Sequence, residues 1–146
     1  MSNARYNLFP SKPSFHMRKG DAQSPTGTGS YLTIEFDTVI HNVGGHYSTT
    51  NHRFVCPLDG RYLFIYTTRI DNHSGSYIRS GLKINGSVDH ENGFFITQDS
   101  GSYTSLNGSQ IIELSANDYV QVYFRTQSDN TITAQGESSF SGMLLD

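Results

Sequence analysis

Large apolar residues recur at every second position in several short segments of this chain. The pattern is clear at residues 32–36 and 120–124, where Leu, Ile, Val or Phe alternates with residues of other kinds. A period of two is typical of strands with one buried face, and no window has the period of an amphipathic helix. Further strands are expected at residues 54–56, 61–69, 82–84, 93–97, 105–114, 131–134 and 140–145.

Turn residues separate these segments. Pro57 lacks a backbone donor and should end the strand before it, and residues 58–60 should turn the chain into the next strand. Asn85-Gly86 predicts a two-residue hairpin, and Asn107-Gly108 is expected to split the segment 105–114. With a further turn at 116–118, the pattern favours an antiparallel sandwich or jelly roll.

The segment from residue 36 to residue 64 carries the most distinctive motif. An Asn-x-Gly-x-x-Tyr run precedes a Phe-x-Cys-Pro-x-x-Gly-x-Tyr-x-Phe run, and the chain closes with Phe-Ser-Gly-x-Leu-Leu. The residues of the motif that we expect to be structural are Phe36, Asn42, Gly44, Tyr47, Phe54, Pro57, Gly60, Tyr62, Phe64, Phe140 and Gly142. The aromatic members should fill the space between two sheets, and Gly44, Gly45 and Gly60 should occupy turns with positive φ.

These motifs, in this order and spacing, resemble the globular head domain of complement component 1q, a branch of the tumour necrosis factor superfamily. The resemblance runs from about residue 14 to the C-terminus, and departs from the family pattern at residues 51–53 and at Asp59, both in turns. It implies an all-β, ten-stranded antiparallel jelly roll that assembles as a homotrimer. We therefore expect one domain at residues 13–146, preceded by a tail or linker at residues 1–12.

Composition excludes several classes of protein. The chain has 146 residues, 10 Lys and Arg against 13 Asp and Glu, and a net charge of −3, which leaves no basic footprint for nucleic acid. No apolar run is long enough to span a membrane, and no signal peptide opens the sequence. Asn-x-Ser sequons at Asn72, Asn85 and Asn107 give weak support to an extracellular location.

Catalytic and metal chemistry have little support in the sequence. Cys56 is the single cysteine, and its position before a proline favours a buried, inert thiol over a nucleophile. His41, His46 and His52 lie near a Gly-rich turn without the spacing of metal ligands, although a trimer would present one axial histidine three times. No catalytic triad or phosphate-binding loop is present, so we expect no enzyme.

Calcium is kept as a candidate cofactor. Oxygen-rich clusters occur at residues 71–72, 89–92, 99 and 129–130, and some members of the resembled family bind calcium near the trimer apex. Turn residues are rich in oxygen atoms in any case, and no EF-hand loop is present. The sequence does not select a set of ligands.

The loops offer a glycan or anion site, because an aromatic face beside polar donors suits sugars. The candidate ligand-binding residues are Asp71, Asn72, His73, Tyr77, Arg79, Tyr103, Arg125 and Asp129. The leading hypothesis is a secreted, lectin-like trimer that recognises microbial carbohydrate or polyanionic surfaces in innate immunity. The alternatives are a secreted ligand for a receptor protein and a structural trimeric tip of a fibre, with a Cys56-dependent hydrolase last.

Overall fold

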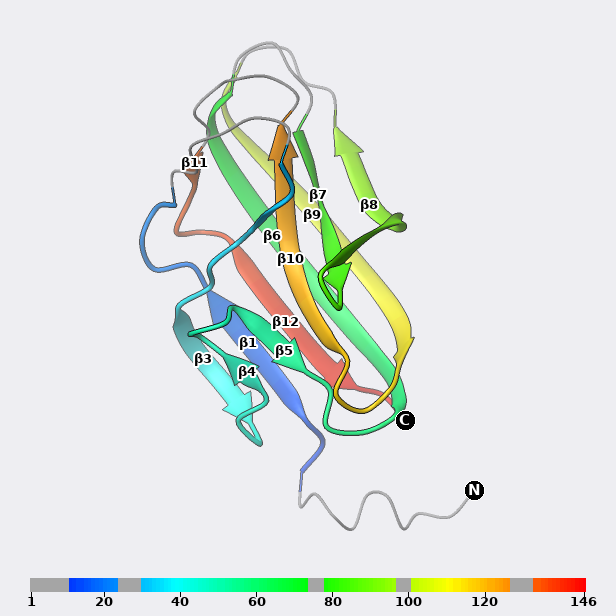
Figure 1. Cartoon of the computed structure of the whole chain (residues 1–146). Coiled ribbons are helices and arrows are strands. Elements are labelled where there is room, and N and C mark those ends of the chain that lie inside the picture. The colour runs from blue at the N-terminus through cyan, green and yellow to red at the C-terminus, as the bar shows by residue number, and fades with distance from the viewer. Residues whose placement is uncertain (1–10, 24–29, 74–77, 97–100, 127–132) are drawn as a thin grey trace.

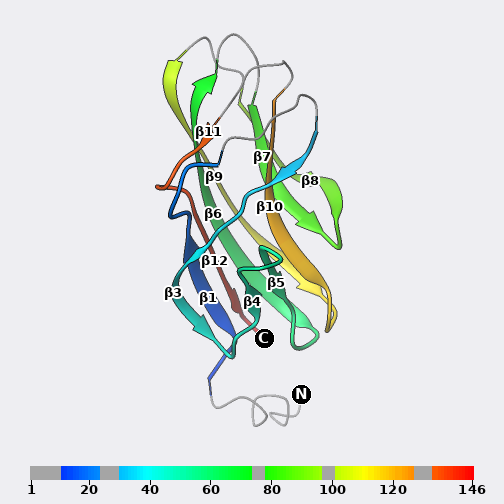
Figure 2. The same cartoon turned by 60° about the vertical axis from the view of Figure 1, so that its left-hand side comes forward.

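The computed structural model describes residues 11–23, 30–73, 78–96, 101–126 and 133–146. Two layers of β-strands pack face to face, as Figures 1 and 2 show. The strands are β1 (Ser14–Arg18), β2 (Leu32–Thr33), β3 (Thr38–Val43), β4 (Tyr47–Ser48), β5 (Arg53–Val55), β6 (Gly60–His73), β7 (Ile78–Ile84), β8 (Ser87–Ile96), β9 (Gly101–Leu114), β10 (Tyr119–Thr126), β11 (Thr133–Ala134) and β12 (Ser139–Leu144). In these residues we find no helix with the length and apolar character that a membrane crossing requires.

Sheet A is built around the long strand β6. Strand β9 pairs with one edge of β6, and β12 pairs with the other, followed outward by β1 and the edge strand β3. Strand β11 pairs with β6 beyond the end of β12. All of these pairings are antiparallel.

Sheet B has the order β4, β5, β10, β7, β8, with β2 beside the far end of β10. Every pairing is again antiparallel. The predicted antiparallel jelly roll is confirmed. The described residues form twelve strand segments where ten were expected, and three of them, β2, β4 and β11, are only two residues long.

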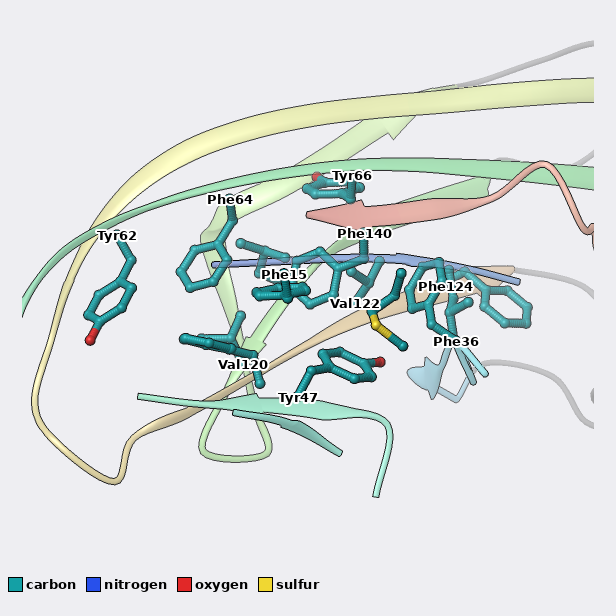
Figure 3. Close-up of a cluster of buried hydrophobic side chains, with 14 of the residues drawn as sticks. Phe15, Phe36, Tyr47, Tyr62, Phe64, Tyr66, Val120, Val122, Phe124 and Phe140 are labelled. Atoms are coloured by element: carbon teal, nitrogen blue, oxygen red, sulfur yellow. The ribbon is translucent and has the colours of Figure 1, made fainter. Parts of the chain in front are cut away.

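The core lies between the sheets and is mostly aromatic. Along β6, Tyr62, Phe64 and Tyr66 are fully buried while the residues between them face outward, which is the alternation that the sequence predicts. The Phe15 ring packs 4.8 Å from that of Phe54 and from that of Phe140, so strands of both sheets meet around it. Figure 3 shows Phe15 and Phe140 within this cluster of buried side chains. Each such ring buries a large apolar area, which gives this chain of modest hydropathy an adequate core.

Three of the predicted turns are confirmed. Strand β5 ends at Val55, two residues before Pro57, and β7 and β8 are joined by Asn85 and Gly86 with φ of 52° and 80°. Those two positive values are what a type I′ hairpin requires. Asn117, with φ of 74°, turns the chain between β9 and β10.

The expected split at Asn107-Gly108 is wrong. Both residues pair in register with β6, and β9 continues through them. A Cβ atom at Gly108 would overlap the ring of Tyr66 beneath it. Glycine is therefore present to let a strand pass closely over an aromatic side chain, and the same dipeptide does not form a turn here.

The expected positive φ is found at Gly44 (82°) and Gly45 (71°), but Gly60 is not among the residues with positive φ. Gly60 is the first residue of β6, and a Cβ atom there would overlap the backbone carbonyl oxygen of Asp146. Its role is to admit the C-terminal end of the chain, whose Asp146 carbonyl accepts a hydrogen bond from the Arg61 amide at 3.0 Å.

Candidate binding surfaces

Large aliphatic side chains are exposed on the outer face of sheet A. Leu63 of β6 lies opposite Ile111 of β9 on one side and opposite Met143 of β12 on the other, and Ile65 is the next outward residue of β6. Ile65 is 50% exposed, Ile111 62% and Met143 42%. Contiguous apolar surface of this kind marks an interaction site in a soluble domain. We call Leu63, Ile65, Ile111 and Met143 the apolar patch.

Two hollows flank Ile65 on this face. One of about 250 Å³ is lined by Ser14, Phe15, His41, Leu63, Ile65, Ser141, Gly142 and Met143. The other, of about 320 Å³, is lined by Ile65, Tyr66, Thr67, Asn107, Gly108 and Ser109. The small residues beside the apolar patch thus leave depressions between the larger side chains. Side chains of a partner could fit into these depressions.

The edge of the same face carries two histidines. His16 of β1 lies opposite His41 of β3, and their rings are perpendicular with centroids 6.1 Å apart. Partial burial lowers the pKa of His16, and the neighbouring His41 and Arg18 lower it further. Val39 and Ile40 of the edge strand β3 are also exposed.

Arg69, Asp71 and Tyr103 form a second cluster on the outer side of sheet A. Asp71 and Tyr103 are cross-strand partners, and the Arg69 guanidinium lies 4.5 Å from the centre of the Tyr103 ring. Arg69 is also 3.7 Å from a carboxylate oxygen of Asp71 and 2.6 Å from one of Glu137. Burial raises the pKa of Asp71, although Arg69 opposes that shift.

Three cationic side chains of the described residues lie together on the outer face of sheet B. Arg79 of β7 and Arg125 of β10 are cross-strand partners, and each donates an Nη1 hydrogen bond to the Tyr31 hydroxyl, at 3.0 and 2.9 Å. Lys83 Nζ donates to the Tyr31 carbonyl at 2.6 Å and to Thr33 Oγ1 at 3.3 Å. We call Tyr31, Arg79, Lys83 and Arg125 the arginine–tyrosine cluster.

The candidate residues named from the sequence therefore belong to two different faces. Asp71 and Tyr103 lie together in sheet A, whereas Arg79 and Arg125 lie together in sheet B. Tyr77 and Asp129, and the side chains of Asn72 and His73, lie outside the described part of the chain. Sequence reasoning missed the residues that organise each face, listed here: Tyr31, Leu63, Ile65, Arg69, Lys83, Ile111 and Met143. Strand alternation identifies the outward positions of β6 and β9, but the sequence does not indicate that Tyr31 reaches β7 and β10.

Metal ligands do not converge within the described residues, where no group of three or more His, Cys, Asp or Glu side chains could hold an ion. Of the oxygen-rich clusters, residues 99 and 129–130 lie outside the described chain, as do the side chains of residues 89–92. Calcium stays a prediction for those positions.

Cys56 is buried in the core. Burial, with a smaller contribution from Asp118, raises the pKa of its thiol to about 12. The thiol is therefore protonated at neutral pH and lacks the reactivity of a nucleophile.

Comparison with known proteins identifies relatives of this chain in sequence and in fold. The sequence profile of the C1q domain matches residues 15–145. The mouse complement C1q tumor necrosis factor-related protein 2 is 30% identical over 117 residues, which are 76% of this chain and 38% of that protein. The Bacillus subtilis (strain 168) protein YqcC is 35% identical over 102 residues, 64% of this chain and 27% of that protein. The chain thus spans well under half the length of both relatives. The globular domain of zebrafish complement 1qA superposes with a TM-score of 0.66 at 16% identity, covering 93% of this chain and 98% of that one.

Proposed function

The chain belongs to the C1q domain family, and from that premise we propose that it is a secreted, homotrimeric binding module that recognises carbohydrate or polyanionic surfaces. The observation that carries the proposal is the apolar patch on the outer face of sheet A. A surface of this composition is costly to leave in water, and three copies packed around an axis would remove it from solvent.

Self-association accounts for the patch better than a small ligand does. Its hollows are shallow and their lining contains no buried charge, whereas sites for small ligands use a few well-placed polar groups in a deep cleft. The neighbouring Ser14, Ser109 and Ser141 are small, which allows a second copy to approach closely.

Trimerisation also supplies a mechanism for binding. Three weak sites held on one rigid body engage a repetitive surface with an avidity that exceeds each single affinity by a factor of roughly 10² to 10⁴. A microbial polysaccharide is such a repetitive surface. No catalytic step is needed, and the Cys56 thiol is unsuited to one.

A second candidate function is that of a secreted ligand for a receptor protein, and the similarity to a tumor necrosis factor-related relative favours it. A relative also occurs in Bacillus subtilis, so the target is defined by its chemistry and is not assigned to an animal immune pathway. In either function the trimer is the active species.

The test is a screen of neutral and anionic polysaccharides and lipopolysaccharide, with and without chelator, on the wild-type chain and on Ile65→Arg. We expect the wild type to bind at least one class of polysaccharide and Ile65→Arg to lose roughly a hundredfold in apparent affinity through lost avidity. Thr50→Arg, in an exposed turn, adds the same charge as a control.

If the wild type binds no polysaccharide but captures a membrane protein, the second candidate function, a secreted ligand for a receptor protein, is favoured. Equal binding by the wild type and Ile65→Arg would show that binding does not depend on trimerisation through the apolar patch. Loss of binding in chelator would assign calcium to the site.

A further inference from the structure

We propose that His16 and His41 form a pH-sensitive switch on the assembly face, and that protonation of their imidazoles weakens the contact between copies of this chain. The proposal rests on the function proposed above, because it takes the outer face of sheet A as the surface that the copies share. It adds a condition under which the trimer dissociates.

The histidine pair lies in the same cross-strand row as the centre of the apolar patch. His16 of β1 is opposite His41 of β3 on one side and opposite Ser141 of β12 on the other, and Ser141 is in turn opposite Ile65 of β6. Neighbouring strands are about 4.8 Å apart, so His16 and Ile65 are separated by roughly 10 Å along this row. His41 also lines the hollow of about 250 Å³, together with Ile65 and Met143. The histidines and the apolar patch therefore share one surface.

A contact that covers the apolar patch has to extend beyond it. Stable interfaces bury about 800 Å² on each partner. The patch occupies two adjacent rows on β12, β6 and β9, which is roughly 10 Å by 7 Å between Cα atoms and far less than that area. From β12 the sheet continues through β1 to β3, so the rows of the patch lead directly to the histidines.

The surroundings of the pair oppose a positive charge. Arg18 is the next residue of β1 on the same face, and β12 presents Ser139 and Ser141 opposite β1, neither of which titrates. Partial burial lowers the pKa of His16 most, and His41 and Arg18 lower it further. A second copy packed over the pair would add to the burial, and so to the first of these causes.

Carboxylates are absent from the three strands that carry and flank the pair. Strands β1, β3 and β12, all within the described residues, contain no Asp or Glu. Asp37 directly precedes β3, and its carboxylate accepts hydrogen bonds from the Gly20 amide at 2.7 Å and the Thr38 hydroxyl at 2.9 Å. It also lies 3.6 Å from the ammonium group of the buried Lys19. This carboxylate is therefore already engaged by other groups.

Protonation changes this part of the face from neutral to charged. A neutral imidazole can be covered by a second copy at little cost, whereas an imidazolium loses its hydration when it is covered. The two rings of one chain have centroids 6.1 Å apart, so their charges would also repel each other. Assembly therefore favours the neutral pair. The contact is strongest above pH 6.5 and weakens as the pH falls through the lowered pKa of His16 in the free chain.

The test measures the dissociation constant of the intact chain by light scattering over a dilution series, at pH 7.5 and at pH 5.5. The wild type should assemble roughly tenfold or more weakly at pH 5.5, because each proton excluded by assembly contributes up to about tenfold per pH unit. His16→Gln/His41→Gln should have the same dissociation constant at both pH values. His52→Asn removes a histidine from the turn between β4 and β5 of sheet B, where Asn suits the φ of 49°, and should respond to pH as the wild type does.

Circular dichroism at both pH values checks that each chain is folded. A wild-type trimer that is equally stable at both pH values, or a double variant that keeps the wild-type response to pH, would overturn the switch and leave the proposed function standing. A wild type that is a single chain at pH 7.5 would overturn both. If the wild type unfolds at pH 5.5 or the double variant fails to fold, His41→Lys decides at pH 7.5. A permanent charge at this exposed position should weaken assembly roughly tenfold or more, and unchanged assembly would contradict the switch.

Discussion

The outer faces of the two sheets use the same strand architecture for opposite chemistry. At the apolar patch of sheet A, cross-strand neighbours are aliphatic, as in the row of Met143, Leu63 and Ile111. On sheet B, the corresponding cross-strand neighbours are Arg79 and Arg125. The first surface is stabilised by leaving water, whereas the second is stabilised by staying in it or by meeting an anion.

We propose that the two faces have different tasks on one sandwich. The aliphatic face contacts other copies, which excludes solvent, and the face that carries Arg79 and Arg125 stays open to solvent. Both faces rest on the same aromatic core, so a change in one need not disturb the other. Variants that damage one face, the other, or the link between the sheets test this division.

The largest effect is expected at the point where β9 passes over Tyr66. Gly108→Val should destabilise the chain by about 3 kcal/mol or more, because the added side chain must displace the buried Tyr66 ring. The measurement is the midpoint of urea unfolding. Ser109→Val introduces the same side chain one residue further on, where it points outward, and should change stability by less than about 0.5 kcal/mol. An equally stable Gly108→Val would contradict the close passage of the strand.

A smaller effect is expected at the polar link between the sheets. The buried hydroxyls of Thr68 and Ser80 are 2.9 Å apart, and Ser80 also donates to the Tyr123 carbonyl at 2.9 Å. Ser80→Ala should cost about 1 to 3 kcal/mol, because it removes the buried hydroxyl that bonds Thr68 and the Tyr123 carbonyl. Ser141→Ala on the outer face of sheet A is the control for stability, and should be nearly neutral. Equal unfolding midpoints for the two variants would contradict the role of the link.

The smallest effect is a dependence on pH at the edge of sheet A. The pKa of His16 is lowered from its ordinary value of 6.5, so the unfolded chain takes up a proton at higher pH than the folded chain does. The neutral His16 therefore contributes to the free energy of unfolding above pH 6.5. This contribution is lost as the pH falls below 6.5 and passes through the lowered pKa of the folded chain. His16→Gln should flatten this part of the stability curve.

A titration followed by NMR checks the cause. His41→Gln should raise the pKa of His16, because it removes one of the two neighbouring charges that oppose protonation. An unchanged pKa in that variant would show that His41 has no part in the shift.

The sequence predicts the fold well because its signals are local. The alternation in β10 and the Asn85-Gly86 hairpin follow from neighbouring residues, and both are confirmed. Gly108 and Gly60 were misinterpreted because glycine is needed there to fit Tyr66 and Asp146, which are distant in the sequence. Local patterns do not report such contacts.

The sites were predicted less well for the same reason. The sequence groups Asp71 and Arg79 in one loop, whereas the structure places them in different sheets. Arg79 and Arg125 are brought together by strand pairing, and Tyr31 joins them from a segment 48 residues away from Arg79 in the chain. A side-chain cluster assembled across strands becomes visible only once the register is known.

The molar mass of the chain in solution, measured by light scattering over a dilution series, tests the division of the two faces most directly. The wild type and Thr50→Arg should have three times the 16.3 kDa of one chain, and Ile65→Arg should have the mass of one. A wild-type mass of a single chain at micromolar concentration, or a trimer that survives Ile65→Arg, would contradict the assignment of sheet A to assembly.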